Sequence, residues 1–288
     1  AVSPSVAALH GPRGGQRRHG HRAVDRLRPR LAPAGGLIGP LPAPASDPAA
    51  TAAHDFDRVD VRGVSRHYGR RRALFEITTS FHAGEIVGLL GPNGSGKSTL
   101  LGVIATIVRP ASGVVSYGGR PAREWGDTLR ARIGMLGHDL FLYGDLTARE
   151  NLEFFGRLHR VADLAHRVDA ALQHARLETR GGDRVMGFSR GMRQRLALER
   201  ALIHDPRLVL LDEPFTGLDD ESTSLLVERL RALRTTGAIV LMATHDFDTA
   251  DGLVDRAVCL TNGRLQPIED GGGTLRERFR RAVEARRA

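Results

Sequence analysis

The stretch Gly91–Thr99 has a composition and spacing suited to holding phosphate groups. It reads GPNGSGKST, follows the apolar run Ile86–Leu90 directly and precedes apolar residues at helical spacing, which is the context that a GxxxxGK[ST] motif requires. Glycines let backbone N–H groups converge on phosphate oxygens at a helix N-terminus, where unpaired donors and the helix dipole favour anions. Lys97 is expected to reach the β- and γ-phosphates, and Ser98 to bind Mg²⁺. The predicted nucleoside triphosphate site comprises Gly91, Pro92, Asn93, Gly94, Ser95, Gly96, Lys97, Ser98 and Thr99.

Lys97 is also the only lysine in the chain. The sequence has 42 basic residues, and the other 41 are arginines. A bias of this strength acts on the composition of the whole chain, so the single exception indicates a position that arginine cannot fill. A compact ammonium group fits among phosphate oxygens where a wide planar guanidinium group does not. Composition and motif therefore indicate the same residue.

An acidic pair supplies the chemistry that a phosphate site alone lacks. The apolar run Leu208–Leu211 ends in Asp212 and Glu213. At a strand end, Asp212 can hold Mg²⁺ or a water molecule bound to it, and Glu213 can accept a proton from an attacking water as general base. Such a pair is usually only a solvated loop, but together with the phosphate motif it indicates nucleotide hydrolysis.

The elements that must position these residues alternate between strands and helices. Ile86–Leu90, Leu208–Leu211 and residues 238–243 are continuous apolar runs, as expected of strands buried on both faces of a parallel sheet. Thr147–Glu150 has the pattern of a helix capping box, and Val258–Leu265 reads as a strand, an Asn-Gly turn and a strand. The expected fold class is α/β with a mixed sheet.

Composition and charge restrict the class of protein. The net charge is +9, but residues 1–53 contribute +5, residues 274–288 contribute +4, and residues 54–273 balance to zero. A nucleic-acid-binding domain carries its basic face on the folded part, so no nucleic-acid partner is expected. The single cysteine excludes a disulfide scaffold. No segment approaches the roughly 20 consecutive apolar residues of a membrane-spanning helix.

These patterns divide the chain into three segments. Residues 1–53 contain no Phe, Tyr or Trp and eight of the 14 prolines, and such a composition cannot bury enough apolar surface to fold. We expect residues 1–55 to form a disordered tail, which is either part of the working protein or a spurious N-terminal extension. Residues 56–273 are predicted as the nucleotide-binding domain, and residues 274–288 as a basic C-terminal helix or tail.

Residues 58–270 resemble the nucleotide-binding subunit of an ABC (ATP-binding cassette) transporter. The discriminating stretch is Phe188–Met192, FSRGM, which resembles the LSGGQ signature of that family. The resemblance implies a P-loop NTPase fold with a helical subdomain at about 140–200 that carries the signature. It also implies a head-to-tail homodimer in which Ser189 and Gly191 of one domain cap the γ-phosphate held by the other.

Three positions depart from the family pattern. Arg190 and Met192 stand where the signature has Gly and Gln, but because Ser189 and Gly191 remain, we expect the cap to work. His138 takes the place of the family's Q-loop glutamine. An imidazole can accept a hydrogen bond from Mg²⁺-bound water or bind the metal through one nitrogen, so the resemblance implies that His138 keeps the role at the metal.

The remaining site residues follow from the same resemblance. Asp219 resembles the D-loop aspartate that bridges to the partner's P-loop. His245 resembles the switch histidine that contacts the γ-phosphate and acts with Glu213 and Lys97 as a catalytic group. Tyr68 resembles the aromatic residue that stacks on adenine, with packing alone as the alternative. The resemblance thus implies ATP as the nucleotide and Mg²⁺ as its metal.

The stretch Leu136–Phe155 is similar to the haem exporter ATPase of c-type cytochrome maturation, in which a Gly-His pair replaces Pro-Gln. This similarity implies haem export through separate integral membrane permease subunits, with the chain bound peripherally at the cytoplasmic face of the inner (cell) membrane. An exporter of a drug, an ion or a glycan is the alternative.

A soluble ABC ATPase acting on nucleic acid or ribosomes fits less well, since only 49 residues separate His138 from Phe188 and one P-loop is present. Such ATPases carry either a long coiled-coil insertion or two tandem cassettes. Leu140–Tyr143 is placed where the family docks its membrane subunit and is expected to form an interaction patch, with ordinary core as the alternative.

Overall fold

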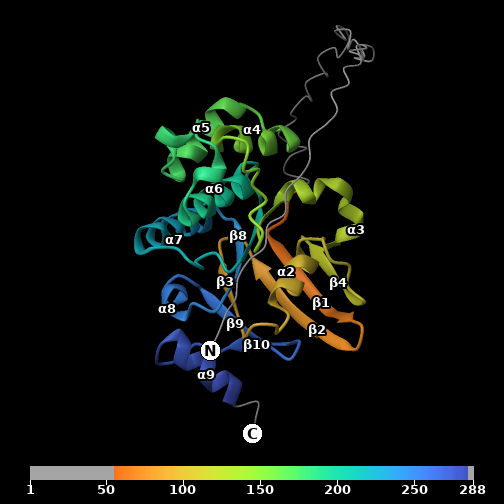
Figure 1. Cartoon of the computed structure of the whole chain (residues 1–288). Coiled ribbons are helices and arrows are strands. Elements are labelled where there is room, and N and C mark those ends of the chain that lie inside the picture. The colour runs from red at the N-terminus through yellow and green to blue at the C-terminus, as the bar shows by residue number, and fades with distance from the viewer. Residues whose placement is uncertain (1–54, 285–288) are drawn as a thin grey trace, which may run out of the picture. The chain divides into compact units, whose positions relative to one another are not determined.

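The computed structural model describes residues 55–284 of the chain. The tail predicted at 1–55 therefore lies outside the described residues, apart from Asp55, and so do the last four residues of the predicted C-terminal segment. Within the described part, two sheets and the helices around them carry the fold (Figure 1).

The six-stranded sheet positions the site. Its order is β10-β9-β3-β8-β7-β6, and all neighbours are parallel except β10 and β9, which are antiparallel. The predicted mixed sheet is thus confirmed. Because the parallel strands share one direction, residues that follow β3, β7 and β8 meet at one edge. The strands are β3 (Ile86–Leu90), β6 (Ile133–Leu136), β7 (Leu208–Asp212), β8 (Ile239–Thr244), β9 (Arg256–Thr261) and β10 (Arg264–Ile268).

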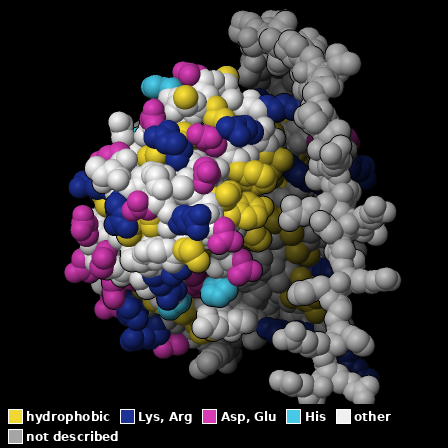
Figure 2. All heavy atoms as spheres, turned by 45° about the horizontal axis from the view of Figure 1, so that its top comes forward, with side chains coloured by type: hydrophobic (Ala, Val, Ile, Leu, Met, Phe, Trp, Pro, Cys, Tyr) yellow, Lys and Arg dark blue, Asp and Glu magenta, His cyan; other side chains and the backbone are white. Residues whose placement is uncertain are grey.

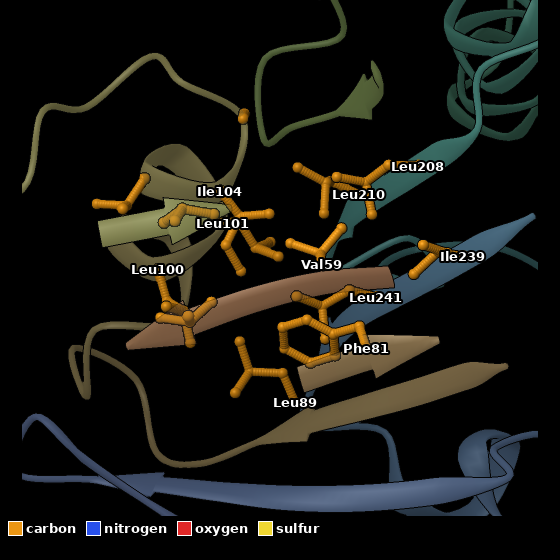
Figure 3. Packing of buried hydrophobic residues seen from close by; sticks show 14 of the residues in the cluster. Val59, Phe81, Leu89, Leu100, Leu101, Ile104, Leu208, Leu210, Ile239 and Leu241 are labelled. Carbon is orange, nitrogen blue, oxygen red and sulfur yellow. The ribbon is translucent and has the colours of Figure 1, made fainter. Parts of the chain in front are cut away.

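A four-stranded antiparallel sheet covers one face of this sheet. Its order is β2-β1-β4-β5, and α2 packs with it around a common hydrophobic core. Figure 3 shows Leu101 of α2 and Val59 of β1 in this core together with Leu241 of β8. The strands of this sheet are β1 (Arg58–Tyr68), β2 (Arg71–His82), β4 (Ser112–Tyr117) and β5 (Arg120–Pro121). The helices of this part are α2 (Lys97–Ile104), α3 (Ala122–Trp125) and the short 3₁₀ turns Gly126–Thr128 and Arg130–Arg132.

The other face of the six-stranded sheet has its own core. Along β7, Leu208 and Leu210 belong to the first core, whereas Val209 and Leu211 belong to the second. This alternation follows from the two-residue repeat of a strand, and burial on both faces explains why the strand reads as an unbroken apolar run. The helices of this side are α7 (Asp220–Thr235), α8 (Phe247–Ala250) and α9 (Leu275–Glu284).

Three helices with a separate core gather at one end of the described part (Figure 1). The first begins at the predicted capping box, because the Thr147 hydroxyl accepts from the Glu150 N–H and the Glu150 carboxylate accepts from the Thr147 N–H. This end of the fold carries the Phe188–Met192 signature. Its elements are α4 (Ala148–Leu158), α5 (Leu164–His174), α6 (Arg190–Leu202) and the 3₁₀ turns Glu178–Arg180 and Val185–Gly187.

Candidate nucleotide-binding site

The phosphate loop joins β3 to α2 and has room only for glycine at two positions. Gly91 has φ 155° and Gly96 has φ 112°, both in the region that favours glycine. A Cβ atom at Gly91 would lie 2.2 Å from the Leu260 carbonyl oxygen of β9, and one at Gly96 would lie 2.3 Å from the Ala73 carbonyl oxygen of β2. The loop is therefore pressed between strands of both sheets, and this contact fixes its path.

Lys97 lies at the first position of α2 with its side chain 6% exposed. Its ammonium donates to the Gly91 carbonyl oxygen at 2.8 Å, and its Nζ lies 3.6 Å from Oε1 of Glu213. The two sequence motifs, more than 100 residues apart, are thus in contact. A buried ammonium beside a helix N-terminus gives the pocket a positive charge suited to an anion.

Glu213 lies in an unusual backbone conformation immediately after β7. Its φ is 53°, in the left-handed region that only a small fraction of non-glycine residues adopt. Its N–H donates to the Ala243 carbonyl oxygen of β8 at 2.8 Å, which holds the turn in place. Oε2 lies 2.7 Å from Nδ1 of His245. An ionised carboxylate can only accept a hydrogen bond, so with Glu213 ionised the Nδ1–H of His245 is the donor of this one.

The other oxygen of Glu213 has a different environment. Oε1 is buried and accepts no hydrogen bond from any described residue, and the nearest cation is the ammonium of Lys97. The Glu213 carboxylate is therefore held on one side by His245, and its other oxygen, Oε1, keeps an unused acceptor position beside the Lys97 ammonium. A general base needs such an acceptor within hydrogen-bond reach of the water it deprotonates.

Lys97 and Glu213 line a pocket of about 390 Å³. Tyr68 stands at its rim, 48% exposed, and the guanidinium of Arg66 covers its ring at 4.8 Å. Of the predicted loop residues, Gly91 and Ser95 are buried behind the pocket and Pro92 is exposed beside it. The lining residues are Tyr68, Arg71, Ala73, Asn93, Gly94, Gly96, Lys97, Ser98, Thr99, Asp212 and Glu213.

The pocket residues fit Mg²⁺ held together with a nucleotide. Ser98 and Asp212 line the same pocket and offer a hydroxyl and a carboxylate, and such oxygens are the ligands that Mg²⁺ prefers. The described residues contain no group of three or more His, Cys, Asp and Glu placed to hold a metal. Mg²⁺ usually takes one or two protein oxygens and completes its shell with phosphate oxygens and waters.

Arg71 is a pocket residue that the sequence reasoning missed. It opens β2, and its Nη2 donates to the Gly94 carbonyl oxygen of the phosphate loop at 2.5 Å. The signal was the run Arg70–Arg72, which follows Tyr68 and Gly69. In a chain so rich in arginine, that run did not stand out. Since successive strand residues point to opposite faces, the structure was needed to select Arg71.

Besides Gly91, Pro92 and Ser95, five predicted residues do not line this pocket: His138, Ser189, Gly191, Asp219 and His245, the last of which contacts Glu213 instead. His138 is exposed just beyond β6, which is the edge strand of the sheet next to β7. Ser189, Gly191 and Asp219 lie at helix N-termini away from the phosphate loop: Ser189 caps α6, accepting from the Met192 N–H at 3.2 Å, and Asp219 caps α7. The signature and the phosphate loop of one chain therefore belong to two separate surfaces.

The cap role also sets the charge of Asp219. Its carboxylate accepts from the Ser222 N–H at 2.8 Å. Hydrogen bonds from the backbone and side chain of Ser222, with a smaller contribution from Arg195, hold the pKa of Asp219 below its ordinary value. Asp219 is therefore ionised at neutral pH at an exposed helix N-terminus, where a negative charge is favourable.

Apolar side chains form an exposed patch on the end that carries α4 to α6. Phe141 is 65% exposed, Tyr143 50% and Met186 62%, and Figure 2 shows hydrophobic side chains gathered on this face. Leu140 and Leu142 pack against the cores instead. The predicted patch at Leu140–Tyr143 is thus half surface and half core. Phe141 and Met186 line a groove of about 560 Å³ with Arg193.

Comparisons with known proteins identify the family. The ABC transporter family profile matches residues 74–216. Nod factor export ATP-binding protein I of Rhizobium johnstonii (strain DSM 114642 / LMG 32736 / 3841) is 40% identical over 210 residues, which is 72% of this chain and 67% of that protein. The protein of the same name from Rhizobium meliloti is 40% identical over 208 residues, or 72% of this chain and 62% of that protein. The chain thus spans about two thirds of the length of these relatives.

Solved structures agree. An ATP-binding subunit of an ABC transporter matches with a TM-score of 0.72 and 30% identity over 78% of this chain and 99% of that chain. The dimeric ATP-binding cassette MJ0796, bound to ADP and Pi, matches with a TM-score of 0.66 and 27% identity over 74% of this chain and 100% of that chain. No helix among the described residues has the length and apolar character needed to cross a membrane. Together with the pocket geometry, these likenesses show that the chain belongs to the ABC transporter family as an ATP-hydrolysing cassette.

Proposed function

We propose that the chain is the ATP-hydrolysing subunit of an exporter, in which two copies act together with separate integral membrane subunits. The observation that carries this proposal is the division of the site: the phosphate pocket and the signature of one chain lie on different surfaces. A signature that caps phosphate must therefore act on a nucleotide held by another copy. The dimeric state of MJ0796 gives the proposal further support.

The catalytic steps follow from the contacts around Glu213. Lys97 exchanges the Gly91 carbonyl for phosphate oxygens, which carry more negative charge and bind an ammonium more strongly. His245 holds Oε2 of Glu213, so Oε1 takes the proton from the attacking water. Tyr68 stacks on the base. When bound, Mg²⁺ neutralises charge on the phosphate oxygens, and Ser98 and Asp212 are the residues that would hold it.

The partner cassette completes the site. Ser189 and Gly191 of one copy approach the γ-phosphate in the other copy's pocket with a hydroxyl, backbone N–H groups and the positive end of α6. Asp219 bridges to the partner's phosphate loop. His138, exposed beyond β6, is proposed to approach the metal only when the cassette closes, and His138→Gln should retain ATPase activity. An inactive variant would contradict this equivalence.

The exposed patch at Phe141, Tyr143 and Met186 is the proposed docking surface for the membrane subunit. It combines large apolar side chains with a groove next to Arg193, and apolar patches of this kind on a folded domain mark protein contacts. Docking there would place the chain peripherally at the cytoplasmic face of the cell membrane. It would also connect the membrane subunit to α4, α6 and the signature.

For the cargo, we propose a glycan of the Nod factor kind in preference to haem. Two relatives that are 40% identical bear Nod factor export names. The haem alternative depends on the Gly137-His138 pair and the stretch around it, and neither relative above supports it. The ATPase assignment does not depend on this choice.

Three experiments test the proposal. In the first, the rate of hydrolysis per molecule of the purified chain should rise with protein concentration, because the active unit is a dimer. A rate that is constant over a hundredfold range would contradict the proposed dimer.

In the second, the chain is expressed in a Rhizobium strain lacking Nod factor export ATP-binding protein I, with Glu213→Gln as the inactive control. Restored export supports the cargo class. Loss of covalent haem attachment to cytochrome c on deleting the native gene would favour haem instead.

A further inference from the structure

Arg190 has a position that helix stability does not explain. It is the first residue of α6, directly after the cap Ser189, where the family has glycine. A positive charge is unfavourable at the positive end of a helix, and the first turn of α6 contains no acidic residue to compensate. Any contact that favours this arginine therefore lies outside its own helix.

That contact is with Gly217. A Cβ atom built on Gly217 would lie 2.6 Å from Cζ of Arg190, 2.7 Å from Nε and 2.8 Å from Nη1. The similar distances to three atoms of one guanidinium group show that the group lies over the Gly217 backbone. Gly217 also has φ 72°, so glycine is favoured there for its conformation as well as for the space that Arg190 occupies.

Two further contacts join the same parts of the chain. The Gln194 side-chain amide donates to the Pro214 carbonyl oxygen at 3.0 Å in a buried environment. A Cβ atom at Gly191 would lie 2.9 Å from the Ser222 hydroxyl oxygen. Residues 190, 191 and 194 lie on one side of the first turns of a helix. This side of α6 packs against the stretch from Pro214 to Ser222, which contains the D-loop, Thr216–Asp219.

We propose that Arg190 is a positioning residue that clamps the D-loop to the signature within one chain, so that both segments meet the partner cassette as a single rigid surface. The inference rests on the proposed dimer. Gln194 holds the buried base of this contact, and Arg190 closes its exposed rim. Without the guanidinium, Gly217 becomes free to move, and each partner contact has to order the D-loop separately.

Dimerisation in ATP tests this role. Sedimentation of the Glu213→Gln chain with ATP and Mg²⁺ measures the dimer dissociation constant, because that variant retains the nucleotide. Adding Arg190→Ala should raise this dissociation constant about threefold or more. A change of this size is usual when the interaction between two contacting residues is removed. ATP binding to the dilute monomer, followed by fluorescence of a labelled nucleotide, should not change. Arg193→Ala is the matched control, because it removes an arginine of the same helical turn that faces the groove instead.

A double-mutant cycle gives a second measurement that a general loss of stability would not reproduce. Gly217→Ala should weaken the dimer in the Arg190 chain and weaken it less in the Arg190→Ala chain, where the collision is absent. Additive effects would overturn the proposal, and so would an unchanged dimer constant for Arg190→Ala. Full rescue by Arg190→Lys would also overturn it, since charge rather than the planar group would then suffice. If the Glu213→Gln chain itself fails to dimerise, the proposed function fails instead.

Discussion

The phosphate pocket and the signature surface are built in opposite ways. Around the pocket, Lys97 is buried, two glycines are pressed against strand carbonyls, and side chains from β2, α2 and the end of β7 converge within one chain. At the signature, Ser189 and Arg190 are exposed at a helix N-terminus. The first region encloses a pocket within one chain. The second is an exposed helix N-terminus, and the role proposed for it requires a nucleotide held by another molecule.

The largest expected effect separates chemistry from binding inside the pocket. Glu213→Gln removes the proton acceptor at Oε1 while His245 retains a partner at Oε2. We expect turnover to fall by about 10²–10⁴-fold, the usual contribution of a general base, with ATP binding retained. Single-turnover hydrolysis and nucleotide binding measured side by side would show this. A rate within about twofold of the parent chain would remove Glu213 from the mechanism.

The next largest effect tests the need for lysine. Lys97→Arg places a wide planar group where the side chain is 6% exposed and in contact with Gly91 and Glu213. Loss of charge-assisted hydrogen bonds worth about 1.5–3 kcal/mol predicts ATP binding weaker by about tenfold to a hundredfold, which calorimetry can measure. Arg70→Lys, an exposed change near the pocket, is the control. Equal loss in both variants would show that the effect is not local to the phosphate loop.

A substitution on the signature surface should lower the rate of ATP hydrolysis without changing the affinity of the monomer for ATP. Ser189→Ala removes the proposed γ-phosphate contact and the cap of α6, so we expect hydrolysis at saturating ATP to fall by about tenfold, as for loss of a single hydrogen bond to a charged group. ATP affinity of the dilute monomer should not change. Thr147→Ala removes a cap from α4 at a similar cost in stability of about 1 kcal/mol, and it should leave turnover unchanged. A similar fall in turnover in both variants would show that Ser189 acts only as a helix cap.

A smaller effect concerns the missed pocket residue. Arg71→Ala should raise the KM for ATP by about fivefold with little change in kcat, because one hydrogen-bonding cation is lost at the rim of the pocket. Arg70→Ala is a closely matched control one residue away. Steady-state kinetics distinguishes the two variants. Equal KM values would show that Arg71 only holds the phosphate loop and does not contact ATP.

The smallest effect concerns a buried histidine between the end that carries α4 to α6 and strand β6. The His204 ring on the α6 side stacks on His159 at 3.8 Å, and its Nε2 lies 3.2 Å from the Ile133 carbonyl oxygen of β6. Burial, then the charges of His159, Arg200 and Arg167, lower the pKa of His204 to about 4. Since the unfolded chain takes up this proton near pH 6.5, stability is full above that pH and falls toward pH 4.

Urea unfolding at pH 7.5 and 5.5 measures this contribution. The parent chain should lose about 1 kcal/mol more than His204→Gln between these two pH values, from the difference in proton uptake. His166→Gln, a histidine of α5, is the control. An identical pH dependence in all three chains would show that the buried ring is not responsible.

Local patterns predicted the elements well but could not place surfaces against one another. The apolar runs, the capping box and the phosphate loop each depend on neighbouring residues, and all appear where the sequence placed them. The contact of Lys97 with Glu213, the left-handed turn at Glu213 and the choice of Arg71 from three arginines depend on residues far apart in the chain. Leu140–Tyr143 divides between core and surface for the same reason. The partner-facing roles of Ser189 and Asp219 stay predictions.

The contacts of Gly91 and Gly96 have a mechanical consequence. Gly91 contacts β9 of the larger sheet, and Gly96 contacts β2 of the smaller sheet. The loop therefore connects the two sheets mechanically. A nucleotide that stiffens the loop would stiffen the seam between the sheets as well. Protection of amides from hydrogen exchange would then spread along β2 and β9, far beyond the atoms that the phosphates touch.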